Sequence, residues 1–481
     1  MKNPIIVTIS ELNYKMLYEH LFPGDYDEHG AILSVGISIS KNGTRLLVRD
    51  VFLAKDGVDY VDGERGYRAL NAEFVARTSD YCKENNLGYL AVHCHGGENE
   101  VSFSEDDYSS HKRGYPSLLQ FVGEPIGALV FAKNAVAGEI WTNDGIFKLK
   151  QMVIVGTKIK KLYPAPLKNM STELSPVYDR HARLFGDAGQ SILADLKIGI
   201  IGLGGGGSLL NEWLSRLGVG EIIAVDFDKV EPSNLPRIVG SCKWDSQYWL
   251  TKRKYKFLQK IGSRFSKYKV HVAKRVAKKA NSKIKYTAIV GNILNEKVAK
   301  QLKDVDFIFL ATDNIASRNV FNSLLHQYLI PGAQVGSKVI ANKKSKKIND
   351  IFAVGRMVLP YKYGGCLYCN GWIPPSRLQS ELLSDEEKKK QNYIDNENIE
   401  EPSVITLNVL SAAQIINDFM MMFTGLYPSN LKLQHIFNDV LKRESNSMEL
   451  TSETDCLHCS THPKSNLARG DKGELSCRKS E

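Results

Sequence analysis

The first part of the chain mixes helical and strand-like hydrophobic patterns. Apolar residues recur at helical spacing over residues 10–22 and 67–84. Short apolar runs typical of strands occupy residues 31–38, 45–52 and 88–95. This pattern predicts a mixed α+β domain over residues 1–160, followed by a proline- and lysine-containing linker at 161–176.

Strand and helix patterns alternate in the longer second region, residues 177–481. Strands are predicted at 197–201, 222–225, 285–290, 306–311 and 348–354. Alternation of this kind favours a doubly wound, largely parallel α/β sheet of the Rossmann type.

Composition narrows the choice of protein class. The chain has 481 residues, a net charge of +10 and eight cysteines. Its cations are spread out, and no basic stripe with interleaved aromatic residues indicates nucleic-acid binding. We find no secretory leader and no apolar run approaching the ~20 residues of a membrane span. A cytoplasmic protein without a membrane partner is therefore expected.

A glycine-rich turn follows the first strand of the second region. The turn contains Gly202, Gly204, Gly205 and Gly207, and the next strand ends on Asp226. Glycines let the backbone approach phosphates, and the following helix N-terminus offers free N–H groups. The pattern therefore predicts a nucleotide site, with Asp226 placed to hold a ribose hydroxyl.

The residues after that strand favour ATP over a dinucleotide. Asp226, Asp228, Asn234 and Arg237 fall in a D-x-D-x-V-x-x-S-N-L-x-R pattern. This pattern resembles the ThiF/MoeB/HesA superfamily of ubiquitin-activating-enzyme-like adenylyltransferases. The resemblance implies ATP and Mg²⁺ as cofactors and acyl adenylation as the reaction.

The same resemblance suggests further roles in the site. Asn234 and Arg237 would hold the ATP phosphates, together with a lysine that aligns best with Lys254, although Lys252 competes. Asp313 follows the strand at 306–311 and would coordinate Mg²⁺, but it could also be an ordinary helix N-cap. Arg180 would reach into the site of a second subunit, which implies a homodimer.

Two C-x-x-C pairs predict a four-thiolate Zn²⁺ site with a structural role, and redox chemistry is the alternative. The ligands are Cys366, Cys369, Cys456 and Cys459. Thioester-forming members of the superfamily carry a further cysteine between such pairs, yet residues 370–455 contain none. Adenylation without a thioester step is therefore expected, and a separate conjugating or sulfur-carrier protein could take the product onward.

A second metal pattern lies near the end of the first region. His93 and His95 are two apart on a strand, so both side chains point to one face. Ser104 and Asp107 follow in an S-x-x-D spacing. Counted by the usual distance from the second histidine, however, Asp106 would be the ligand. With Glu28 upstream, this set resembles the JAB/JAMM metallopeptidases. The resemblance implies a catalytic Zn²⁺, Glu28 as general base and Ser104 as an oxyanion donor.

The two predicted chemistries share one plausible substrate, the C-terminal tail of a ubiquitin-like protein. One domain would adenylate that tail and the other would trim or release it. The resemblance places such combinations in bacterial conjugation-like and anti-phage operons. Two alternatives stay open: an adenylyltransferase for a peptide or small carboxylate with a non-catalytic docking domain, and a scaffold with two structural zinc sites.

Overall fold

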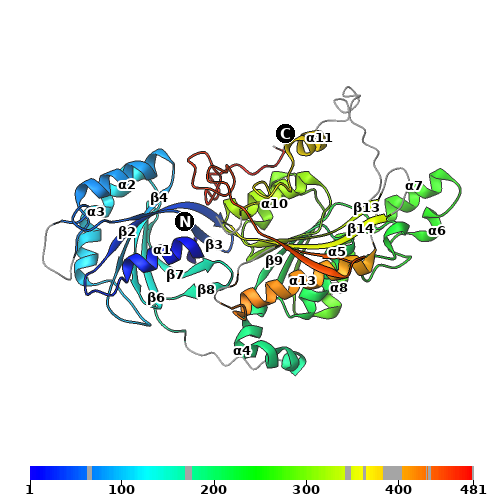
Figure 1. Cartoon of the computed structure of the whole chain (residues 1–481), viewed down its shortest axis with the longest axis horizontal. Helices are drawn as coiled ribbons and strands as arrows, with labels where there is room; N and C mark the ends of the chain where they lie inside the picture. The colour runs from blue at the N-terminus through cyan, green and yellow to red at the C-terminus, as the bar shows by residue number, and fades with distance from the viewer. Residues whose placement is uncertain are drawn as a thin grey trace.

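The structure, a computed structural model, contains one eight-stranded sheet in each half of the chain (Figure 1). It describes residues 1–61, 68–167, 176–341, 348–360, 365–382, 404–428, 431 and 435–478. The N-terminal sheet carries α1 to α3, and the C-terminal sheet lies among the later helices.

The N-terminal sheet has the strand order β1-β3-β2-β4-β5-β6-β7-β8. Because β1 also pairs with β7, the sheet closes on itself around an aliphatic core. Its strands are β1 (Ile5–Ser10), β2 (Gly30–Ser40), β3 (Gly43–Leu53), β4 (Gly88–Cys94), β5 (Ile126–Ala132), β6 (Ala135–Thr142), β7 (Gly145–Val155) and β8 (Ile159–Leu162). Its helices are α1 (Glu11–Leu21), α2 (Ala72–Glu84) and α3 (Glu105–Val122).

Capping side chains set the starts of these helices. Ser10 caps α1, where the pattern predicted a helix. The helix predicted at 67–84 begins only at Ala72, because Asn71 accepts the Phe74 N–H. Residues 62–67 lie outside the described residues. The pattern analysis did not predict α3, which begins with a capping box between Ser104 and Asp107.

The C-terminal sheet has the order β11-β10-β9-β12-β13-β14-β15-β16. Pairing is parallel from β11 to β13 and antiparallel from β13 onward, so the sheet is less uniformly parallel than predicted. The strands are β9 (Lys197–Ile201), β10 (Glu221–Val225), β11 (Lys285–Ile289), β12 (Phe307–Leu310), β13 (Gly332–Ala341), β14 (Ile348–Val358), β15 (His435–Asp439) and β16 (Glu444–Met448). The order of the parallel part is that of a Rossmann sheet, with the chain reversing direction across the sheet between β9 and β12.

Helices flank this sheet and complete its core. They are α4 (Asp179–Asp195), α5 (Gly205–Arg216), α6 (Tyr248–Thr251), α7 (Lys256–Phe265), α8 (Lys269–Ala280), α9 (Glu296–Ala299), α10 (Ile315–Gln327), α11 (Pro375–Leu382) and α13 (Ile405–Thr424). Contrary to the sequence expectation, α13 is long and apolar enough to span a membrane. It packs instead on β13, β14 and α5, and its buried face joins the domain core.

The boundary between the halves differs from the predicted linker at 161–176. Strand β8 ends at Leu162 and pairs with β7, so the first sheet reaches into that range. Residues 168–175 lie outside the described residues.

A C-terminal segment, residues 460–478, ties the two halves together. The fully buried Arg49 of β3 donates hydrogen bonds to the carbonyl oxygens of His462 (2.7 Å) and Ser465 (3.1 Å), and also to that of Leu467. Asp471 accepts the Ile39 N–H at 2.8 Å and pairs with Lys303 at 2.7 Å. The segment thus bridges the first sheet and the Rossmann half.

Candidate functional site

The glycine-rich turn lies at the carboxyl end of β9, beside the ends of β10 and β12. Gly202 has φ +87°, and a Cβ on Gly207 would come within 1.9 Å of the Gly202 carbonyl oxygen. Gly204 is the N-cap of α5, and Gly205 is its first residue. Only glycine fits at Gly202 and Gly207. The N-terminus of α5 is therefore open above the point between β9 and β12 where the strand order reverses.

The Asp226 side chain lies beside this turn and accepts a hydrogen bond from its backbone. Its Oδ2 accepts the Leu203 N–H at 2.6 Å, and its Oδ1 accepts the Asp228 N–H at 2.8 Å. Burial raises the pKa of Asp226, although Lys269 and the two amides oppose the effect. Both carboxylate oxygens therefore accept a hydrogen bond from a backbone N–H beside the site.

Asn234 and Arg237 follow in a short turn after β10. The Asn234 side chain is buried, and its Oδ1 accepts the Glu231 N–H at 3.1 Å. Arg237 is half-buried; its backbone N–H donates to the Asn234 carbonyl at 3.0 Å, and its side chain has no hydrogen bond or ion pair within the part of the chain that the structure describes. Asn234 thus shapes the loop, while the Arg237 guanidinium is available for a ligand.

A third lysine, besides the two predicted, lies beside the site. Lys254 is exposed without a contact among the described residues, and Lys252 lies over the Tyr248 ring. Lys269, at the start of α8, instead pairs with Asp228 at 2.7 Å and is 11% exposed. Lys269 lies further along the chain than the two predicted lysines, because α6 and α7 intervene between Arg237 and Lys269. The S-x-x-K spacing of Ser266 and Lys269 ahead of a helix is the signal that could have found it.

Asp313 lies past the end of β12 and is exposed. It is not the helix cap that the alternative interpretation required, because Asn314 caps α10 by accepting the Ser317 N–H at 2.7 Å. Glu381 of α11 accepts the Ile315 and Ala316 N–H groups at 3.1 and 2.8 Å. The Asp313 carboxylate is therefore open to a ligand.

Arg180 lies in the first turn of α4 and is exposed. Among the described residues its side chain makes no hydrogen bond or ion pair with those of the nucleotide site, and its role on a second subunit stays a prediction.

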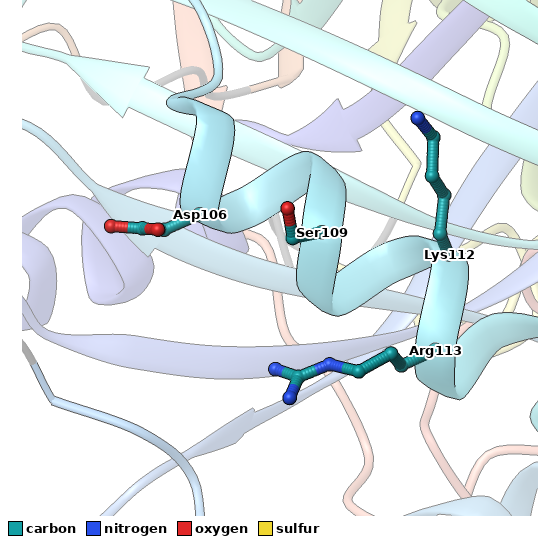
Figure 2. A pocket seen from close by; sticks show the side chains of 4 residues that line it. All are labelled: Asp106, Ser109, Lys112 and Arg113. Carbon is teal, nitrogen blue, oxygen red and sulfur yellow. The ribbon is translucent and has the colours of Figure 1, made fainter.

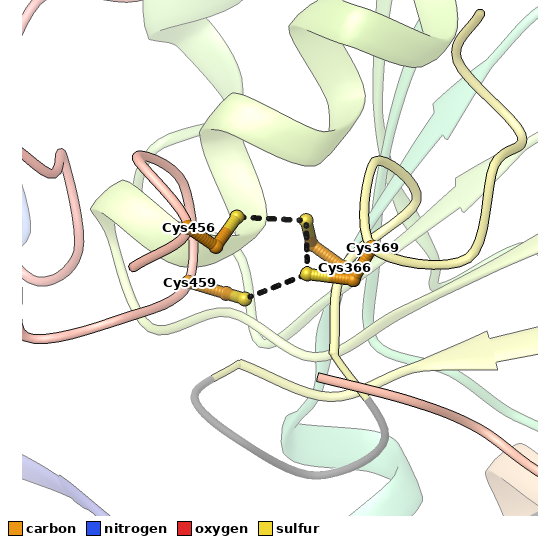
Figure 3. Close-up of side chains that lie close together, drawn as sticks. All are labelled: Cys366, Cys369, Cys456 and Cys459. Carbon is orange, nitrogen blue, oxygen red and sulfur yellow. Dashed lines mark hydrogen bonds between the residues drawn. The ribbon is translucent and has the colours of Figure 1, made fainter. Parts of the chain in front are cut away.

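The four cysteines come together from two distant segments (Figure 3). Cys366 Sγ lies 3.7 Å from Cys369 Sγ and 3.6 Å from Cys456 Sγ, and Cys369 Sγ lies 3.6 Å from Cys459 Sγ. All four are free thiols. Zn–S bonds of about 2.3 Å in a tetrahedron would separate neighbouring sulfurs by roughly 3.8 Å, so the cluster fits Zn²⁺.

A second cluster lies where β4 meets α3. The Nε2 atoms of His93 and His95 are 3.1 Å apart. Asp107 Oδ1 lies 3.3 Å from His93 Nε2, and its Oδ2 lies 3.4 Å from His95 Nε2. A tetrahedral Zn²⁺ with bonds of about 2.05 Å would separate its ligand atoms by roughly 3.3 Å, so this cluster also fits the ion.

The structure distinguishes the two candidate aspartates. Asp107 is buried with the histidines, whereas Asp106 is exposed on the outer face of α3. Figure 2 shows Asp106 in an open pocket with Ser109, Lys112 and Arg113. Of the pair left open by the sequence, only Asp107 lies with His93 and His95.

Glu28 and Ser104 flank this cluster. Glu28 Oε1 lies 3.8 Å from His95 Nε2, and burial raises the pKa of its carboxyl group. Ser104 Oγ donates to Asp107 Oδ2 at 2.7 Å, and its role as an oxyanion donor stays a prediction. Burial alone would raise the pKa of Asp107, but hydrogen bonds from His93, His95 and Ser104 hold it well below its usual range. Within one cluster, the pKa of Glu28 is thus raised and that of Asp107 is lowered.

Two side chains behind this cluster were not predicted from the sequence. His111 lies one turn after Asp107 on α3, and its Nδ1 is 3.5 Å from Glu139 Oε1. Glu139 also accepts the Trp141 Nε1–H at 2.6 Å. The i, i+4 spacing of Asp107 and His111 could have indicated that they share a buried helix face.

The chain is similar in sequence to known adenylyltransferases. Residues 178–475 match the model of the ThiF family. The molybdopterin-synthase adenylyltransferase of Haemophilus influenzae is 29% identical over 30% of this chain and 51% of its own. The sulfur carrier protein ThiS adenylyltransferase of Bacillus subtilis is 30% identical over 32% of this chain and 41% of its own.

The chain thus spans about half the length of the curated relatives it matches. A crystal structure of E. coli MccB with succinimide matches at a TM-score of 0.44, with 22% identity over 60% of this chain and 75% of that chain.

Proposed function

The chain belongs to the ThiF family, and from this premise we propose that it adenylates a carboxylate with ATP. The observation that carries the proposal is the edge formed by the ends of β9, β10 and β12. A phosphate-binding glycine turn, Lys269 and the open Asp313 carboxylate all lie along that edge.

These residues suit attack on an α-phosphate. The substrate carboxylate is ionised at neutral pH, so its oxygen can attack the α-phosphorus without a general base. The bond from that phosphorus to the bridging oxygen breaks, and pyrophosphate leaves with its electrons. Arg237, Lys269 and the N-terminus of α5 would offset the negative charge that gathers on the phosphates. Asp313 would hold Mg²⁺, which supplies further charge compensation when bound.

The proposed substrate is the C-terminal carboxylate of a ubiquitin-like protein. The names of two relatives include molybdopterin synthase and the sulfur carrier protein ThiS as the proteins on which they act. ATP–pyrophosphate exchange with ubiquitin-like proteins from neighbouring genes tests this choice. Exchange with a peptide or small carboxylate, but with none of those proteins, would favour the alternative substrate class.

The N-terminal half supports a second activity, zinc-dependent cleavage of a tail by a JAB/JAMM-like site. His93, His95 and Asp107 would hold Zn²⁺, which makes a bound water acidic enough to lose its proton near neutral pH. Glu28 is placed beside His95 to accept that proton and deliver it to the departing amine. Ser104 fixes the orientation of Asp107 through their hydrogen bond.

A Glu28→Gln variant tests the second activity. Amide replacement removes the base but leaves the three ligands, so hydrolysis of a tail fusion should be lost while bound zinc is retained. Full hydrolysis by this variant would leave the N-terminal half as a docking domain, which is the alternative role.

The four cysteines would hold a second, structural Zn²⁺. Their cluster joins the segment after β14 to the C-terminal segment that contacts Arg49. Removal of this ion should therefore loosen the contact between the halves. No thioester step is proposed for the chain itself, and a separate conjugating or sulfur-carrier protein would accept the adenylated tail.

A further inference from the structure

The segment between Arg237 and Lys269 projects a pair of helices, α6 and α7, at the end of the molecule opposite the N-terminal half (Figure 1). The inner side of α7 is fixed on α6, since Gly262 lies against Leu250 and Thr251. The outer side carries two parallel rows. Phe257, Ile261 and Phe265 form an apolar row, and Lys256, Lys260 and Arg264 form a cationic row.

Both rows face solvent. Phe257 is 61% exposed and Phe265 66%, and the exposed ring of Tyr255 lies beside that of Phe257 and extends the apolar surface. Large aromatic side chains exposed together are uncommon on a protein that has no use for them. This surface of α7 and its aromatic neighbours is called the α7 face below.

Charge on the α7 face has one sign. Between residues 243 and 267 the single acidic residue is Asp245, whose fully buried side chain is paired with Arg275 at 2.7 Å and Lys267 at 3.7 Å. The remaining cations have no acidic neighbour within the segment. An acidic partner would relieve their mutual repulsion, and an apolar patch on it would cover Phe257 and Phe265.

The α7 face is also fixed relative to the nucleotide site. Lys267 N–H donates to the Asp245 carbonyl, and Val230 N–H donates to the Lys267 carbonyl, each at 2.8 Å. Lys269 N–H then donates to the Asp228 carbonyl at 2.9 Å. A partner seated on α7 is therefore held in one position relative to Asp228 and Lys269.

We propose that the α7 face docks the protein whose carboxylate is adenylated, and that this protein presents an acidic surface with an apolar patch. This inference rests on the proposed adenylation and adds the chemistry of the substrate protein. A rigid connection to the nucleotide site suits a substrate better than an anionic membrane, which a basic amphipathic helix can also bind.

A labelled peptide of alternating glutamate and leucine, amidated at its C-terminus, is the probe. The amide cannot be adenylated, so its binding is independent of the reaction. Fluorescence anisotropy should show that the full-length protein binds it, with affinity falling as salt rises. Lys256→Glu/Lys260→Glu/Arg264→Glu and, separately, Phe257→Ser/Phe265→Ser should each weaken binding at least about tenfold.

A matched control carries the same charge change elsewhere. Lys148, Lys150 and Lys283 are exposed, and their triple change to glutamate should leave binding as in the wild type. Equal binding by all variants would overturn the proposal. So would tighter binding of phosphatidylglycerol vesicles through the same two rows. ATP binding should be unchanged in the folded variants, and because the amidated peptide cannot react, a failure of docking stays distinct from a failure of adenylation.

Discussion

The Lys269 ammonium lies 2.7 Å from the Asp228 carboxylate, across the loop that follows β10. This ion pair places a cation at the edge where the glycine turn and Asp313 also lie. A bound phosphate would compete with Asp228 for the Lys269 ammonium. Without a phosphate, the ion pair with Asp228 fixes the position of the Lys269 side chain. The pair makes Lys269 our candidate for the lysine that would bind phosphate at the proposed site.

The first prediction compares Lys269 with Lys254. Lys269→Ala should lower the rate of ATP–pyrophosphate exchange by about 10²–10³, as expected when one charged donor to a transition state is removed. Lys254→Ala should leave the rate within about twofold, because that side chain is exposed and has no contact with the described part of the site. The reverse ranking would restore the original assignment to Lys254.

Zinc content distinguishes the two metal clusters. The wild-type chain should bind two zinc ions, as measured by inductively coupled plasma mass spectrometry after gel filtration. Asp107→Asn and Cys366→Ser should each lose one ion, and Asp106→Asn should lose none, since Asp106 is exposed away from the histidines. Loss of zinc from Asp106→Asn alone would contradict the proposed ligand set.

Arg49 provides a test of the contact between the halves. Arg49→Met should destabilise the protein by about 3 kcal/mol, because two buried carbonyl groups and one part-buried carbonyl group lose a charged donor. Hydrogen exchange should then quicken over residues 462–471. Arg77→Met is the control, because Arg77 is mostly exposed and pairs only within the N-terminal half. Unchanged exchange in Arg49→Met would show that other contacts hold the segment.

Subunit mixing tests the role of Arg180. If Arg180 completes the site of a second subunit, Arg180→Ala and Lys269→Ala should each be inactive alone. Mixed dimers should regain activity in one of their two sites. Sedimentation velocity of the wild type should give a dimer. A monomer that is fully active would rule out this role.

The sequence predicted much of the fold because its signals were local. The turn from Gly202 to Gly207, the cap at Ser10 and the apolar strand at 307–310 all depend on neighbouring residues. Tertiary contacts decided the rest. The closure of β1 on β7 and the antiparallel strands after β13 depend on pairings between distant segments, which single-chain patterns do not record.

In the candidate sites too, local spacing predicted some residues, and tertiary contacts decided the others. H-x-H and C-x-x-C spacings located the candidate metal ligands, because two such residues lie within one turn or strand. Lys269 was missed since α6 and α7 separate it from Arg237. The choice of Asp107 over Asp106 depended on which face of α3 is buried. Spacing alone could not settle that, although the capping box at Ser104 offered a hint.

The most direct test of the central claim is the product of one turnover. The protein is mixed with ATP, Mg²⁺ and a candidate ubiquitin-like protein, and both nucleotide and protein are analysed by mass spectrometry. We predict release of pyrophosphate and a ubiquitin-like protein heavier by one AMP at its C-terminal carboxylate. Formation of ADP and phosphate, with no AMP on any carboxylate, would contradict the account.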